Sequence, residues 1–320
     1  MQPLAGILVA DFTRYLPGAY ASRELLRLGA RVVRVEPLDG DPLRRTAAGW
    51  DARLRAGSES VVCDLKADPE LARLLCARAD VVLEGFRPGV AAKLGIGPDD
   101  VSERTVYCSI TGFGSSGHHA ARAGHDLNYL GWAGALADTA PGLPEIQAAD
   151  LAAGALGAVT RVLAALLERE RTGAGARIVV SMTHGSHDLV SHRLDGDPVP
   201  RMLTGALACY RVYECADTRL LTVGALEEKF FTRLCAVIGR ADLAERQYAP
   251  EQETLAEELA SVFARRTLAE WLELFAGEDA CVGPVATLEE AAAEFALEPT
   301  GIVPELGEHT DTWRRELGLG

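Results

Sequence analysis

The first 180 residues of the chain alternate short apolar runs with stretches in which apolar positions recur at helical spacing. The segments between the runs are long enough for helices, and Gly29 stands where a helix end favours a left-handed residue. Strands separated by such helices pair in parallel through right-handed crossovers. We therefore expect a mostly parallel sheet, with strands at residues 7–12, 31–35, 61–62, 81–83, 106–110 and 177–180.

The longest predicted helix runs from about Asp150 to about Arg171. It is followed by Gly173, a residue suited to a helix end. Aspartate is a preferred N-cap, so we expect Asp150 to begin this helix. One apolar stripe follows the helix: Leu151, Ala155, Val159, Val162, Leu163, Leu166 and Leu167.

The composition changes over residues 190–205, where aspartate, glycine and proline accumulate. Such a segment is typical of a linker. We therefore expect an α/β protein with a large parallel-sheet domain over residues 1–189 and a smaller α+β domain over 206–298. In the smaller domain, strands are expected at 209–212 and 220–223, and helices at 228–238, 254–263, 268–275 and 288–295.

The composition is that of a soluble globular protein, with 48% hydrophobic and 24% charged residues. A net charge of −14 argues against nucleic acid or an anionic membrane as the main partner. The seven cysteines are scattered and never form a Cys-x-x-Cys pair, which disfavours a metal site or a disulfide framework. No apolar run reaches the roughly 18 residues of a membrane span. These features predict a cytoplasmic protein without a metal.

The first strand, helix and second strand resemble a dinucleotide-binding unit only in outline. That motif needs Gly-x-Gly-x-x-Gly, so that the pyrophosphate can approach the backbone. The turn here, 13–20, contains the single glycine Gly18. We therefore expect neither a nicotinamide nor a flavin cofactor.

Three polar segments could carry chemistry. His125 precedes Asp126 in a polar stretch, which suits proton transfer near neutral pH. Asp150 lies at the start of the long helix, and Glu227 opens a helix after a strand. Each also has a purely structural explanation, as a loop histidine, a helix cap or a first-turn acid.

Together and in this order, these segments resemble the class III coenzyme A-transferase family (CaiB/BaiF), and within it the α-methylacyl-CoA racemase branch. The similarity covers nearly the whole chain. It rests on the segments 16–21, 28–36, 63–66, 80–89, 94–95, 111–117, 171–173, 282–285 and 306–311.

The resemblance implies a homodimer whose two chains interlock like rings. A large Rossmann-like domain is joined to a small domain, and residues 299–320 return to the large one. The active site is expected between the large domain of one subunit and the small domain of the other, where Glu227 would meet His125 and Asp150. For coenzyme A, the resemblance points to Lys66, Arg87 and Lys93.

The racemase branch implies that His125 and Asp150 act as opposed bases on the α-carbon of a 2-methyl or otherwise 2-substituted acyl-CoA. One removes the α-proton to give an enolate, and the other returns a proton to the opposite face. Asp126 and Glu227 would orient His125, and the helix N-terminus beside Asp150 could stabilise the enolate oxygen. No cofactor beyond the coenzyme A moiety is expected.

Two alternatives remain open at this stage. In the transferases of the family the residue at Asp150 is a nucleophile that forms mixed anhydrides with acyl groups. A third possibility is a CoA-binding protein without catalysis. The basic residue often found after the second strand is replaced by Pro37, for which Arg44 or Arg45 could compensate. The sequence does not specify the acyl group.

Overall fold

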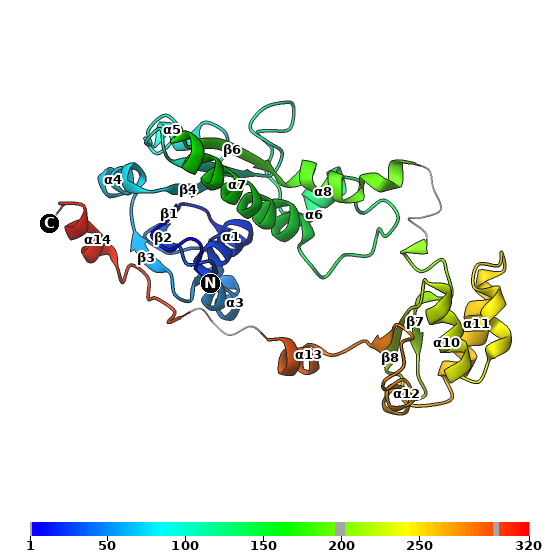
Figure 1. Cartoon of the computed structure of the whole chain (residues 1–320). Coiled ribbons are helices and arrows are strands. Elements are labelled where there is room, and N and C mark those ends of the chain that lie inside the picture. The colour runs from blue at the N-terminus through cyan, green and yellow to red at the C-terminus, as the bar shows by residue number, and fades with distance from the viewer. Residues whose placement is uncertain (1, 196–201, 297–300, 320) are drawn as a thin grey trace. The chain divides into compact units, whose positions relative to one another are not determined.

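The structure is a computed structural model that describes residues 2–195, 202–296 and 301–319. The chain forms two compact units (Figure 1). Unit 1 comprises Met1–Ser191 and Glu298–Gly320, and unit 2 comprises His192–Leu297. Part of the predicted linker, residues 196–201, lies outside the described residues, as do residues 297–300.

Unit 1 is built on a six-stranded sheet in which every neighbouring pair of strands is parallel. The strand order is β3-β2-β1-β4-β5-β6, so the direction of winding reverses between β1 and β4. Ligands of such sheets bind outside the carboxyl ends of the strands at this reversal. The predicted α/β class and parallel sheet are confirmed, with strands β1 Leu8–Asp11, β2 Arg31–Glu36, β3 Glu59–Val62, β4 Val81–Glu84, β5 Val106–Thr111 and β6 Ala176–Ser181.

Alternate strand residues point to opposite faces of the sheet. Both faces of this sheet are apolar, and helices cover each of them. Val9 belongs to an apolar cluster with α1 and α7, whereas Leu8 and Ala10 belong to another with α4 and α14. The helices of unit 1 are α1 Tyr15–Arg27, α2 Leu43–Thr46, α3 Ala48–Arg55, α4 Glu70–Arg78, α5 Val90–Lys93, α6 Asp126–Trp132, α7 Gly157–Thr172, α8 Met182–Val190 and α14 Thr310–Glu316.

The long predicted helix is present but begins differently. Its first segment, η1 Ala149–Leu156, is π-helical and continues directly into α7. Ala148 occupies the N-cap, so the prediction that Asp150 caps this helix is wrong; Asp150 is its second residue. Gly173 ends the helix with φ 75°, as predicted.

By length and composition alone, Ala149–Thr172 could cross a membrane, with a mean hydropathy of 1.6 in its most apolar window. In this fold one face of the helix packs in the core, and 39% of that window is buried. Val162 is fully buried and Leu166 nearly so, and both pack in the cluster between the helices and the sheet. Packing against the sheet therefore explains Val159, Val162 and Leu166 of the apolar stripe, whereas Leu167 is 67% exposed.

The end of the chain runs along the outer edge of β3. The N–H of Gly57 donates to the carbonyl of Ile302 at 2.8 Å, and the N–H of His309 donates to the carbonyl of Ser60 at 2.9 Å. The following helix, α14, packs beside β3 (Figure 1) with the Trp313 side chain fully buried. Backbone pairing and an aromatic anchor thus join this segment to unit 1.

Unit 2 contains a three-stranded antiparallel sheet in the order β7-β8-β9. Its core is formed by aromatic and aliphatic side chains such as Phe231, Phe263 and Trp271. The elements are β7 Tyr210–Glu214, β8 Leu220–Gly224, β9 Val282–Pro284, α10 Glu228–Val237, α11 Gln252–Phe263, α12 Leu268–Leu274 and α13 Leu288–Phe295.

Candidate active site

Two adjoining cavities lie at the carboxyl edge of the sheet in unit 1. The larger has a volume of about 590 Å³ and the smaller about 310 Å³. Arg14, Tyr15, Gly85 and Phe86 line both cavities. These residues follow β1 and β4, between which the strand order reverses, so the cavities occupy the place where the fold favours ligand binding.

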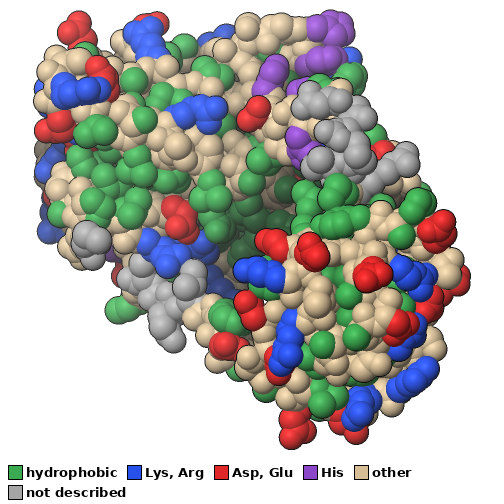
Figure 2. Space-filling model, turned by 45° about the vertical axis from the view of Figure 1, so that its right-hand side comes forward, with side chains coloured by type: hydrophobic (Ala, Val, Ile, Leu, Met, Phe, Trp, Pro, Cys, Tyr) green, Lys and Arg blue, Asp and Glu red, His purple; other side chains and the backbone are tan. Residues whose placement is uncertain are grey.

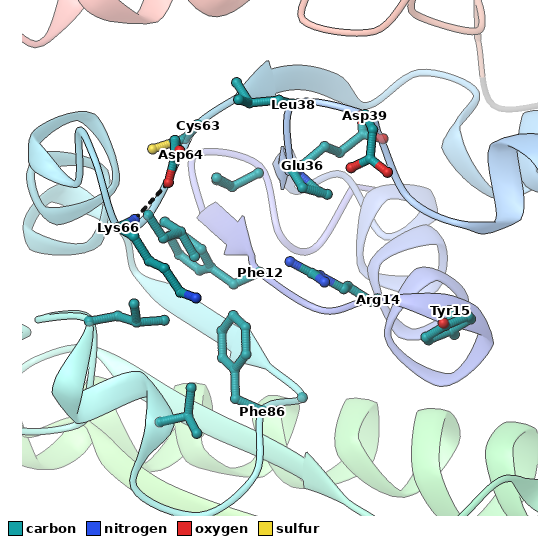
Figure 3. Close-up of a pocket in the computed structure, with 16 residues that line it drawn as sticks. Phe12, Arg14, Tyr15, Glu36, Leu38, Asp39, Cys63, Asp64, Lys66 and Phe86 are labelled. Atoms are coloured by element: carbon teal, nitrogen blue, oxygen red, sulfur yellow. Dashed lines mark hydrogen bonds between the residues drawn. The ribbon is translucent and has the colours of Figure 1, made fainter.

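The larger cavity combines aromatic walls with two cations (Figure 3). The rings of Phe12 and Phe86 lie across its floor, and the Lys66 amino group points toward them. The Arg14 guanidinium reaches in from the opposite side, from the turn after β1. Flat apolar surfaces beside positive charges suit a ligand with an aromatic base and phosphate groups.

Glu36 also lines this cavity but does not act as a free anion. Arg44 donates to both of its carboxylate oxygens at 2.6 Å, and the Ser60 hydroxyl donates at 2.6 Å. Burial alone would raise the pKa of Glu36, but these hydrogen bonds outweigh it and lower the pKa to about 2. Arg44 is therefore paired with Glu36 and lines neither cavity, and its role as a substitute phosphate ligand stays a prediction.

The smaller cavity brings His125 and Asp150 together. His125 directly precedes α6, and its backbone N–H donates to the Asn128 side-chain oxygen at 3.0 Å. Its exposed ring meets the Tyr15 ring edge to face, with centroids 5.9 Å apart. The imidazole is thus both oriented by the protein and open to a ligand.

Two features fix the surroundings of His125, one at Tyr15 and one at Gly124. Tyr15 has a φ of 62°, a left-handed conformation that strains a bulky residue, and its N–H donates to Asp41 at 3.1 Å. On the other side, the Tyr129 hydroxyl donates to the carbonyl of Gly124. A Cβ at Gly124 would lie only 2.7 Å from the Tyr129 ring, so glycine is required for this close approach.

Asp126 is engaged with the long helix rather than with the imidazole. Its carboxylate, only 8% exposed, accepts the backbone N–H of Asp150 at 2.8 Å and that of Ala149. Within the described residues, no hydrogen bond joins the Asp126 and His125 side chains. Asp126 therefore performs the capping task that the sequence analysis assigned to Asp150. It also occupies two N–H groups at this helix start, those of Ala149 and Asp150, where the sequence analysis placed a possible contact to an enolate oxygen.

The Asp150 carboxyl has an unusual protonation equilibrium. Burial, and then the negative charge of Asp126, raise its pKa to about 7. At neutral pH the group is therefore present in both protonation states. A carboxyl of this kind can give or take a proton without a large energetic cost.

The predicted coenzyme A residues are distributed unevenly. Lys66 lines the larger cavity and Arg87 the smaller one, whereas Lys93 lines neither, although Val90 and Leu94 beside it do. Glu227 belongs to unit 2, where it is exposed at the N-cap of α10.

Sequence reasoning missed several residues that line the cavities. Among them are Phe12, Arg14, Tyr15 and Arg122. The position of Arg14 directly after the first strand could have drawn attention to it, because strand ends at a reversal of order form the site. Arg122 carried no comparable signal, since its loop has no regular pattern.

The chemistry gathered at this edge is that of an enzyme. Two proton-exchanging groups share one cavity, and cations and aromatic rings in the next cavity suit an anionic ligand. The chain belongs to CoA-transferase family III, whose family model matches residues 4–317. The expected family membership is therefore confirmed.

The chain is similar to both racemases and transferases of this family. It is 37% identical over 308 residues to the alpha-methylacyl-CoA racemase of Homo sapiens, covering 90% of this chain and 78% of that protein. It is 32% identical over 315 residues to the probable fatty acyl-CoA transferase Rv3272 of Mycobacterium tuberculosis, covering 85% and 80%. A crystal structure of Rv3272 matches with a TM-score of 0.81 at 28% identity, over 98% of this chain and 99% of that one.

Proposed function

We propose that the protein is an acyl-CoA racemase that inverts the α-carbon of a 2-methyl or otherwise 2-substituted acyl-CoA. The observation that carries this proposal is that His125 and Asp150 line the same cavity of about 310 Å³. The similarity to alpha-methylacyl-CoA racemase supports it.

The proposed reaction is a two-base 1,1-proton transfer. One base removes the α-proton, the thioester carbonyl takes up the electron pair as an enolate, and the other base protonates the opposite face. His125 and Asp150 suit these roles, because a pKa of about 7 lets Asp150 start in either protonation state. Each positioned acid or base contributes roughly 10²–10⁴ in rate.

Coenzyme A is proposed to lie in the larger cavity, which joins the smaller one at Arg14 and Phe86. Lys66 and Arg14 would hold its phosphates, and the rings of Phe12 and Phe86 would support the adenine. Arg87, in the smaller cavity, would lie nearer the thioester. No further cofactor or metal takes part in this proposal.

We further propose that the protein works as a cytoplasmic, interlocked homodimer. In this arrangement the partner subunit supplies the second wall of the active site. Glu227 would come from the partner's small domain and stabilise the protonated form of His125. The exposed position of Glu227 at the start of α10 leaves its carboxylate accessible for such a contact.

The test is α-proton exchange in deuterated water. Incubation with a panel of single-enantiomer 2-methylacyl-CoAs should incorporate deuterium at the α-carbon and form the other enantiomer. His125→Ala should lower the exchange rate by roughly 10²–10⁴, while coenzyme A binding is retained. His309→Ala, which alters a histidine on the β3 edge, is the matched control. Unchanged turnover in His125→Ala would remove the residue from the mechanism.

A CoA-transferase is the second candidate, because relatives of this chain include succinyl-CoA:glutarate CoA-transferases of mouse and human, each 28% identical. In that reaction Asp150 would attack the thioester and form a mixed anhydride, releasing the coenzyme A thiolate. Hydroxylamine trapping with mass spectrometry would detect an Asp150 hydroxamate in the transferase and none in the racemase. Tight coenzyme A binding without exchange or transfer would instead identify a non-catalytic protein.

A further inference from the structure

Three arginines that line the smaller cavity lack a carboxylate partner. Several arginines of unit 1 pair with acids, as Arg31 does with Glu59 at 2.7 Å, whereas others in the described part of the chain, such as Arg53, form no ion pair. Within the described part of the chain, the side chains of Arg14, Arg87 and Arg122 form neither ion pairs nor hydrogen bonds. In a chain of net charge −14, unpaired cations around one cavity indicate an anionic ligand.

Arg14 and Arg122 differ in the cavities that they line. Arg14 belongs to the part that also lines the larger cavity, where coenzyme A is proposed to bind. Arg122 lines only the smaller cavity and lies three residues before His125. An acyl-CoA whose coenzyme A moiety occupies the larger cavity would therefore place its acyl group in the smaller cavity, which Arg122 lines together with His125 and Asp150.

Arg122 is held by aromatic contacts that leave its N–H groups free. The guanidinium carbon lies 5.2 Å from the centroid of the Trp132 ring, and the His119 ring packs on Trp132 at 4.3 Å. A guanidinium over an aromatic face is oriented without using its donors. Its planar fork of N–H groups matches a carboxylate, which can accept two parallel hydrogen bonds.

The neighbouring His119 does not compete with Arg122 for the anion. Histidine side chains gather at one edge of the face seen in Figure 2, and His118 and His119 are in ring contact at 4.9 Å. Burial and the nearby charges of Arg122 and His118 lower the pKa of His119, which favours its neutral ring. Arg122 is therefore the fixed positive charge of this Trp132–His119–Arg122 stack.

We propose that Arg122 binds a carboxylate at the far end of the acyl group, so that the substrate is a short 2-methyl dicarboxylic acid carried as its monothioester. This inference rests on the proposed function and narrows its substrate class. The cavity of about 310 Å³ that unit 1 forms by itself has room for a short acyl group.

The test compares two matched substrates, 2-methylglutaryl-CoA with its thioester at the methyl-bearing end, and the ω-methyl ester of the same compound. Deuterium exchange and the dissociation constant are measured for each, in the wild-type protein and three variants. Arg122→Ala removes the charge, and Arg122→Lys keeps the charge but loses the fork. Arg53→Ala removes an exposed arginine of α3 that lines neither cavity and serves as the control.

We expect the wild-type protein to prefer the carboxylate over the ester in kcat/KM. Arg122→Ala should weaken binding and kcat/KM for the carboxylate by roughly 10- to 100-fold, with the ester unaffected. Arg122→Lys should lose less, and Arg53→Ala should change neither substrate. Equal losses for both substrates, or no loss for the carboxylate, would overturn the role of Arg122.

The dissociation constants distinguish a failure of the racemase proposal from a failure of the carboxylate site at Arg122. If neither compound exchanges its α-proton, the racemase proposal fails for this substrate class. Arg122 is then still judged by whether Arg122→Ala selectively weakens binding of the carboxylate. If exchange occurs equally well with both compounds and both bind equally, the racemase proposal survives and the carboxylate site is refuted.

Discussion

The carboxylate of Asp126 accepts the backbone N–H of Asp150 at 2.8 Å, although the two residues are 24 positions apart. Asp126 is also the chain neighbour of His125. One buried side chain therefore connects the start of α6, which carries the histidine, to the start of η1, which carries the acid. Asp126 is thus a positioning residue that fixes the spacing of the two proposed bases.

Replacing Asp126 by asparagine should change the pH dependence of exchange. The negative charge of Asp126 raises the pKa of Asp150, so Asp126→Asn should lower that pKa while burial keeps it above the ordinary value of about 3.9. The limb of the pH–rate profile that reports Asp150 should move to lower pH. The asparagine oxygen can still accept one N–H, which preserves the helix start.

The pKa of Asp150 can also be followed directly by carboxyl ¹³C NMR, without a substrate. Asp188→Asn, on the exposed side of α8, removes the same charge elsewhere and should leave the profile in place. An unchanged Asp150 titration in Asp126→Asn would contradict the electrostatic coupling.

Replacing Asp150 by asparagine should abolish exchange but stabilise the protein at alkaline pH. The folded-state pKa of about 7 lies above the ordinary value, so the folded state favours the protonated acid and loses stability as the pH rises between the two values. The loss is up to about 1.4 kcal/mol per pH unit. Urea unfolding should show the advantage of Asp150→Asn at pH 8 and little of it at pH 4. An equal effect at both pH values would contradict the raised pKa.

The Glu36 carboxylate should stabilise the protein at neutral pH, whereas the Asp150 carboxylate destabilises it, so Glu36→Gln should lower the free energy of unfolding at pH 7. The folded pKa of Glu36, about 2, lies below its ordinary value, so its ionic contribution is present above about pH 4.5 and lost as the pH falls toward 2. At pH 7 Glu36→Gln should cost about 3 kcal/mol in the free energy of unfolding, because Arg44 loses its buried partner.

The matched control for Glu36 is Asp39→Asn, which breaks the exposed Asp39–Arg45 pair. Surface pairs are worth about 0–1 kcal/mol, so this variant should unfold almost like the wild type. If both variants lose equal stability, the Glu36–Arg44 pair has no special role in unit 1.

Mixed dimers test whether an active site is shared between subunits. Co-expression of His125→Ala with Glu227→Gln should regain activity that each homodimer lacks, because one site of the mixed dimer receives both native residues. With random assortment, about a quarter of wild-type activity is expected for a twofold-symmetric dimer. Activity no greater than that of the separate variants would show that Glu227 does not act across the interface.

The sequence predicted the elements whose pattern is strong. The six strands of unit 1 are short, apolar and separated by amphipathic helices, and all were found close to the predicted residues. Helix α6 was missed because it is seven residues long and includes Gly131. Strand β9 was missed because it has three residues, two of which, Gly283 and Pro284, disfavour strands.

The candidate site was predictable only in its residue types. His125 and Asp150 were selected from the sequence, and the structure places both at one cavity. The role of Asp126 could not be inferred, because its hydrogen bond to Asp150 joins segments that meet only after folding. The same holds for Arg122, whose contact with Trp132 depends on how its loop folds against α6.

The segment that covers β3 is synthesised after the whole of unit 2. Unit 2 is complete in sequence before residues 302–310 exist, whereas unit 1 is started before unit 2 and finished after it. During translation the nascent sheet therefore carries an unpaired edge strand, the kind of surface that promotes aggregation. The order of folding need not follow the order of synthesis: the inserted unit can reach its native state while the enclosing unit still awaits its final strand partner.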